Sequence, residues 1–154
     1  MNFRTWLESN HYEDMCGIAD DLLANAKIDT DYDIPYVAGY SKDGKTFYID
    51  QHVPKSFKSL ELRKSLLRHE SVEKAAEMNL KWGYKASHEM ATKAERAVVQ
   101  KAGIDWDSYD KFCKSLIKDE GHENLKRVPA NLDLLPYETD KDYKLIKRMK
   151  QLMH

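Results

Sequence analysis

A histidine and a glutamate interrupt the apolar stripe of the segment 58–81, which has the periodicity of a long helix. His69 and Glu73 are four residues apart, so both lie on one helix face. They occupy positions at which the stripe calls for apolar residues. The other members of the stripe are Leu62, Leu66, Ala76 and Leu80.

The next periodic segment, residues 86–102, repeats this pattern. His88 and Glu95 are seven residues apart and again share a helix face. The rest of that stripe is Ala91, Val98 and Ala102. Each helix is therefore expected to direct one histidine and one glutamate toward the interior. Because a buried unpaired charge costs several kcal/mol, these groups must pair with one another or bind an ion.

A divalent metal would satisfy these four side chains. Imidazole and carboxylate groups suit zinc, and iron or manganese is possible with the same donors. We predict that His69, Glu73 and His88 bind zinc and that Glu95 is a fourth ligand or supports one of the three. The alternative is a structural network without metal, in which His69 pairs with Glu95 and His88 pairs with Glu73.

Two further residues could take part in chemistry at such a site. Glu70 follows His69 directly, about 100° around the helix. A carboxylate beside the metal face could accept a proton from a water that the metal activates. Tyr84, which lies between the two helices, could donate a hydrogen bond to an oxyanion, or it could simply anchor the loop.

The run His69-Glu70-Ser71-Val72-Glu73 resembles the H-E-x-x-H helix of zincin metallopeptidases, with glutamate in place of the second histidine. The resemblance implies that His69 binds zinc and that Glu70 is the general base. It also implies that Glu73 and His88 complete a set of two histidines and one glutamate. The hairpin before this helix is similar to the zincin sheet, whose edge strand holds an extended substrate. The whole chain also resembles small bacterial or phage proteins, a likeness that implies no activity.

The function expected from these features is a zinc-dependent hydrolase that cleaves a peptide or similar amide bond with a metal-activated water. One alternative is a non-enzymatic binding or regulatory protein whose His/Glu cluster is structural. A second alternative is a two-metal helical hydrolase of nucleotides. Glu77 and Glu89 are spare carboxylates for that site.

The periodicity of the segments around these residues predicts an α+β fold that is mostly helical. One β-hairpin or small antiparallel sheet is expected to pack on the two site helices. The hairpin is expected from strands at 36–40 and 46–50 around an Asp43–Gly44 turn. The other expected elements are a helix at 11–26, an acidic turn at 29–33, a helix capped by Asp105 and ended by Gly121, an irregular stretch at 128–138 and a basic terminal helix at 140–152.

Composition restricts the classes of protein that the chain can belong to. Its 154 residues, of which 42% are hydrophobic and 33% charged, predict a single globular domain over 1–154. A formal net charge of −1 gives no basic field for nucleic acid, so the expected partner is a peptide or protein. Two cysteines, at 16 and 113, outside any C-x-x-C pair, favour the reducing cytoplasm. No membrane span is expected, and no oligomeric state is predicted.

Overall fold

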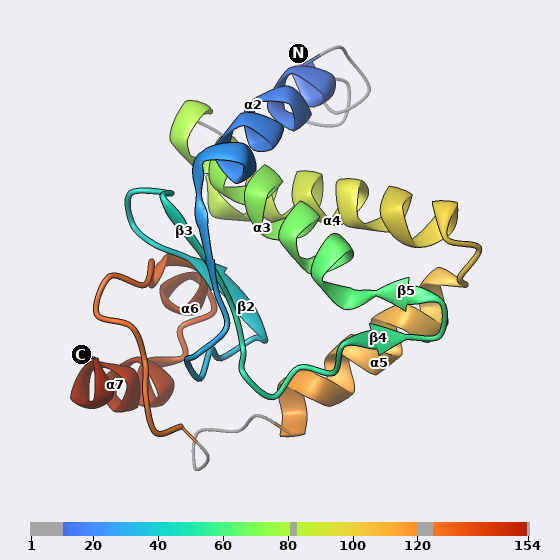
Figure 1. Ribbon diagram of the computed structural model, residues 1–154. Coiled ribbons are helices and arrows are strands. Elements are labelled where there is room, and N and C mark those ends of the chain that lie inside the picture. Colours follow the sequence, from blue (N-terminus) through green and yellow to red (C-terminus); the bar gives the residue numbers. More distant parts are fainter. Residues whose placement is uncertain (1–10, 81–82, 120–124, 154) are drawn as a thin grey trace.

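The mainly helical α+β fold expected from the sequence is confirmed by the computed structural model, which describes residues 11–80, 83–119 and 125–153 (Figure 1). The helices are α2 (His11–Asn25), α3 (Leu62–Asn79), α4 (Tyr84–Lys101), α5 (Trp106–Asp119), α6 (Leu135–Thr139) and α7 (Tyr143–Leu152). The strands are β1 (Lys27–Asp29), β2 (Ala38–Tyr40), β3 (Thr46–Ile49), β4 (Ser56–Phe57) and β5 (Leu60–Glu61). None of the described helices combines the length and apolar character needed to cross a membrane.

The predicted hairpin is formed by β2 and β3, which pair antiparallel with Gly39 opposite Tyr48. Its turn uses the expected Asp-Gly pair. Gly44 has φ +73°, a conformation that glycine adopts without steric cost. Asp43 accepts hydrogen bonds from the Ser41 hydroxyl at 2.6 Å and from the Lys45 backbone at 3.0 Å. These local bonds fix the turn and hence the register of the two strands.

The sheet contains a third strand that the sequence analysis did not predict. β1 pairs parallel with β3, so the strand order is β1-β3-β2 and the sheet is mixed rather than purely antiparallel. The strand is only three residues long and follows α2 almost directly. A strand this short carries too little hydrophobic alternation to be recognised from sequence.

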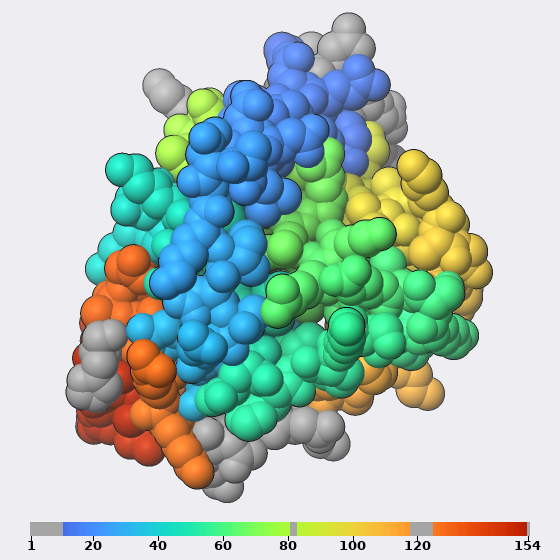
Figure 2. Space-filling view, in the orientation of Figure 1, coloured from blue at the N-terminus to red at the C-terminus, as the bar shows by residue number. Residues whose placement is uncertain are grey.

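Helix α3 occupies the centre of the molecule. It contacts α2 and α4 as well as the sheet strands β2 and β3, and α2 crosses it in Figure 1 and adjoins it in Figure 2. It begins at Leu62 rather than near residue 58 because β4 and β5 form a small antiparallel hairpin just before it. Packing on several sides buries α3 almost all round its circumference, so polar as well as apolar side chains of this helix lie inside the protein.

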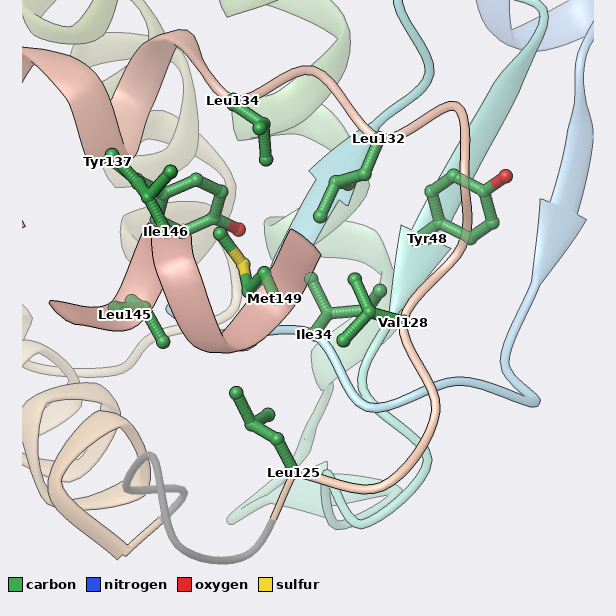
Figure 3. Packing of buried hydrophobic residues seen from close by; sticks show 10 residues of the cluster. All are labelled: Ile34, Tyr48, Leu125, Val128, Leu132, Leu134, Tyr137, Leu145, Ile146 and Met149. Carbon is green, nitrogen blue, oxygen red and sulfur yellow. The ribbon is translucent and has the colours of Figure 1, made fainter. Parts of the chain in front are cut away.

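The C-terminal segment covers the sheet and closes a second part of the core. In this core Met149 of α7 lies beside Ile34 and Val128 (Figure 3). The stretch 128–138, which was expected to be irregular, contains the short helix α6. Its proline lies in the first helical turn, where the missing N–H costs nothing. Gly121, the expected end of α5, lies outside the described residues.

Asp33 connects the N-terminal half of the chain to this C-terminal segment. The residue is 1% exposed. One oxygen accepts the backbone N–H groups of Lys126 at 2.8 Å and Arg127 at 3.1 Å. The other oxygen accepts the side-chain amide of Gln51 at 2.7 Å. The acidic turn expected at 29–33 therefore ends at Asp33, whose carboxylate is buried and hydrogen bonded to other parts of the chain rather than exposed to solvent.

We expect Asp33→Asn to lower the free energy of unfolding near neutral pH by about 2 kcal/mol, because the amide cannot accept all three donors. Burial alone would raise the pKa of Asp33, but the hydrogen bonds from Gln51, Lys126 and Arg127 hold it below its usual value. The stability difference from wild type should therefore be complete above about pH 4 and shrink as the pH falls through the lowered pKa.

Urea unfolding across this pH range measures that difference. Asp31→Asn, at an exposed position of the same turn, is the matched control and should have little effect at any pH. If the difference in the free energy of unfolding between wild type and Asp33→Asn stays constant down to about pH 2, the effect cannot be assigned to the Asp33 carboxylate.

Candidate metal centre

Helices α3 and α4 lie side by side and bring three of the predicted ligands together. Glu73 is the common partner. Its Oε2 atom lies 3.0 Å from Nε2 of His69 and 3.0 Å from Nδ1 of His88. The rings of the two histidines meet edge to face, with centroids 4.8 Å apart. The helical spacing of the sequence thus placed His69 and Glu73 correctly on one face, and the short connection to α4 placed His88 opposite them.

The Glu73 carboxylate is buried and fully hydrogen bonded. Only 2% of the residue is exposed, and its second oxygen, Oε1, accepts a hydrogen bond from the Tyr40 hydroxyl at 2.7 Å. Burial alone would raise the pKa of Glu73, but hydrogen bonds from His69, His88 and Tyr40 hold it at about 2. The carboxylate therefore stays ionised in the interior and can accept a cation.

Glu95 lies behind His69 rather than beside the other ligands. Its Oε1 atom is 2.8 Å from Nδ1 of His69, and its Oε2 atom accepts the Tyr109 hydroxyl at 2.6 Å. Burial would lower the pKa of His69, yet the two carboxylates Glu73 and Glu95 raise it well above 6.5. In the metal-free protein the ring is therefore an imidazolium that donates one hydrogen bond to each helix.

The arrangement fits a divalent metal with nitrogen and oxygen ligands. One donor atom from each of His69, Glu73 and His88 lies within 4.8 Å of the others. Tetrahedral zinc with bonds of about 2.0 to 2.1 Å holds its ligand atoms roughly 3.3 Å apart, close to the observed 3.0 Å contacts with Glu73. Glu95 would then accept the remaining N–H of His69 and fix its tautomer, as carboxylates commonly do behind ligating histidines.

Glu70 is buried beside this cluster but makes no hydrogen bond to any described residue. It is 8% exposed and lines the cavity described below. Burial raises its pKa to about 8, with a further contribution from the nearby Glu73 carboxylate. The prediction that Glu70 lies beside the ligand face therefore agrees with its position. Its burial was not foreseen, because α3 packs on more sides than a single apolar stripe indicates.

Tyr84 is the first residue of α4 rather than part of a loop. Its hydroxyl lies 3.5 Å from Nδ1 of His88, and the two rings are 5.8 Å apart at centroid. The phenol lines the same cavity as Glu70. Burial raises the pKa of Tyr84 far above its usual range, so the hydroxyl keeps its proton and acts as a donor.

The cluster opens into a cavity of about 570 Å³ between β2 and the helices α3, α4, α5 and α6. His69, Glu70, Glu73 and His88 lie in its wall. His88 is the most accessible of the ligands, with half of its side chain exposed, whereas the side chain of Glu73 is 3% exposed. A small molecule could therefore reach the donor atoms from the cavity without unfolding either helix.

The sequence analysis missed the two tyrosines that hold the carboxylates. Tyr40, at the end of β2, contacts both Glu73 and Glu77, and Tyr109 on α5 contacts both Glu95 and Ser65. Both rings are almost completely buried. A buried tyrosine needs a partner for its hydroxyl. From this rule both tyrosines could be predicted to need a hydrogen-bond partner. The partners themselves could not be predicted, because they lie on other elements of the fold.

Glu77, one of the spare carboxylates considered for a second metal, serves a different purpose. It accepts a hydrogen bond from the buried ammonium of Lys74 at 3.2 Å, and Lys74 also contacts Asp133 at 3.0 Å. Burial and the neighbouring Asp133 raise the pKa of Glu77 to about 7. Among residues 11–80, 83–119 and 125–153, only the His69, Glu73 and His88 group has the geometry of a metal site.

Comparisons of the chain with known protein families, with curated proteins and with solved structures find no match.

In the metal-free protein we expect the His69 ring to titrate well above pH 6.5, because Glu73 and Glu95 both stabilise its charged form. The stability that this imidazolium contributes is complete below pH 6.5 and is lost as the pH rises through the raised pKa. Histidine Cε1–H resonances followed by NMR measure the titration, with His69→Gln assigning the signal.

Glu95→Gln removes one of the two charges and should lower the pKa of His69 while leaving the ring in place. A His69 signal that titrates at or below pH 6.5 in the wild-type protein would contradict the doubly paired imidazolium.

Proposed function

We propose that the protein is a metal-dependent hydrolase in which His69, Glu73 and His88 hold one divalent ion, most suitably zinc. The observation that carries the proposal is the position of Glu70. This carboxyl is buried, lines the cavity beside the three donor atoms and has no hydrogen-bond partner among the described residues. Among the described residues no side-chain oxygen is both sealed from solvent and unpaired, so the Glu70 carboxyl must open onto the cavity rather than lie sealed in the core. A network that served only to join α3 and α4 has no use for a carboxyl in this position, since its burial costs free energy and it takes no part in the pairing.

Each residue of the site has a separate role in amide hydrolysis under this proposal. A bound zinc ion supplies Lewis acidity, which polarises a carbonyl and activates a water molecule. The positive charge of the bound ion would lower the pKa of Glu70 from the value of about 8 that burial gives it in the metal-free site, so that its carboxylate could accept a proton from the attacking water. Tyr84 would donate a hydrogen bond to the oxygen that becomes negative. Glu95 and Tyr40 orient His69 and Glu73 respectively, so that the donor atoms stay in place when the substrate enters.

A second candidate is a binding or regulatory protein that uses the cluster only as a structural network. The pairs expected for it, His69 with Glu95 and His88 with Glu73, are both formed, at 2.8 and 3.0 Å. Each donor atom of the cluster therefore has a partner without metal. The two candidates differ in their response to zinc and in the role of Glu70.

Glu70→Gln separates the two candidates. The substitution keeps size and shape but removes the base, so zinc binding should persist while turnover falls about 100- to 10,000-fold. Zinc affinity is measured by calorimetry on untagged protein, and turnover on fluorogenic peptides and small amides. Glu89→Gln, an exposed glutamate at the same cavity, is the matched control and should keep both properties.

His69→Ala should abolish zinc binding, and Glu95→Gln should weaken it about 10- to 100-fold. Zinc binding without turnover on any substrate, with Glu70→Gln indistinguishable from wild type, would favour the binding protein. Absence of zinc binding in the wild type would contradict the metal centre and leave the structural network.

A further inference from the structure

The outer edge of the sheet beside the cavity is occupied by the chain itself. The backbone N–H of Asp133 donates a hydrogen bond to the backbone carbonyl of Tyr40 at 2.9 Å. The backbone N–H of Lys42 donates one to the backbone carbonyl of Asn131 at 2.8 Å. Leu132 forms a bridge with Ser41 and also covers Gly39, where an added Cβ would lie 3.0 Å from its Cδ1 atom. An extended peptide therefore cannot pair with β2 from Gly39 onward, which leaves only the Ala38 end of this short strand for the substrate strand that the zincin resemblance implies.

The cavity has the size of a small-molecule site. Its volume of about 570 Å³ lies within the roughly 300 to 1,000 Å³ that such sites span. Five elements bound it, and α4 and α6 contact each other directly. The Ala38 end of β2 also lines the cavity. The space suits a compact molecule better than a chain that must enter and leave in extended form.

Apolar and aromatic side chains line the part of the cavity that reaches from the centre toward α5. They include Leu66, Trp106, Tyr109 and Cys113. Burial raises the pKa of Cys113 to about 12, so the thiol is uncharged and adds to the apolar wall. Of the charged side chains on this helix, Asp110 and Lys114 pair with each other at 2.8 Å. This part of the wall therefore offers an aromatic or aliphatic group an apolar surface.

We propose that the site takes a compact amide carrying one aromatic or aliphatic group, which packs against Leu66 and Trp106, and that it excludes extended peptides. The hydrolytic part of this proposal rests on the function proposed above, whereas the shape of the cavity does not depend on metal. In the reaction the water oxygen bonds to the carbonyl carbon and the C–N bond breaks. The proton taken by Glu70 passes to the leaving nitrogen, so the products are a carboxylic acid and an amine.

Binding of phenylacetamide tests the proposal without requiring turnover. Its effect on the Trp106 indole N–H is followed by NMR in metal-free and zinc-loaded protein, with Trp106→Phe assigning the signal. We expect a saturable shift in both forms. Thr92→Phe, a half-buried position in the cavity wall, should weaken binding at least about tenfold by filling the space, which corresponds to 1.4 kcal/mol.

Ala97→Phe is the matched control, since Ala97 is exposed on the same helix and does not line the cavity. It should leave binding unchanged. An N-acetylated decapeptide amide containing one phenylalanine should neither shift the Trp106 signal nor displace phenylacetamide.

The outcomes separate this inference from the proposed function. Phenylacetamide binding that is sensitive to Thr92→Phe, in a protein that binds no zinc, would support the compact cavity while the hydrolase proposal fails. Zinc binding without a phenylacetamide shift in either form would overturn the inference and leave the metal centre. Competition by the decapeptide would also overturn it, because the proposal excludes extended peptides from the cavity.

Discussion

The buried Glu73 carboxylate is the constraint on which the rest of the structure depends. It lies on the central helix α3 with 3% of its side chain exposed, and an ionised group in such a place is costly without partners. Three groups meet this need: the hydroxyl of Tyr40 and the ring nitrogens of His69 and His88. They come from the sheet, from α3 itself and from α4. Glu73 therefore links these three elements through its hydrogen bonds.

The same principle extends outward from His69. Its second ring nitrogen, Nδ1, is hydrogen bonded to one oxygen of Glu95. The other oxygen of Glu95 accepts a hydrogen bond from the hydroxyl of Tyr109 on α5. Successive hydrogen bonds thus connect α3 to α4 and α4 to α5, and the last of them holds α5 at the wall of the cavity. A fully satisfied network of this kind is rigid, which is what a metal centre needs. Glu70 stands outside this network, since its carboxyl lines the cavity and makes no hydrogen bond to another described residue.

The sequence predicted the parts of the site that lie within one helix or on two consecutive helices. His69 and Glu73 share a face because of helical geometry alone, and the brief connection before α4 leaves His88 little freedom. Tyr40 could not be assigned in this way, since it is 33 residues from Glu73 and its role depends on how the sheet packs on α3. The burial of Glu70 was missed for a related reason, because tertiary contacts cover α3 beyond its apolar stripe.

X-ray absorption at the zinc edge of the zinc-loaded protein tests the metal centre most directly. The account predicts one zinc per chain with two imidazole nitrogens and at least one carboxylate oxygen at about 2.0 to 2.2 Å, together with a further light ligand. His88→Ala should remove one imidazole contribution from the spectrum. A zinc shell of water oxygens alone, or an imidazole contribution that is undiminished in His88→Ala, would contradict the assignment of these residues as ligands.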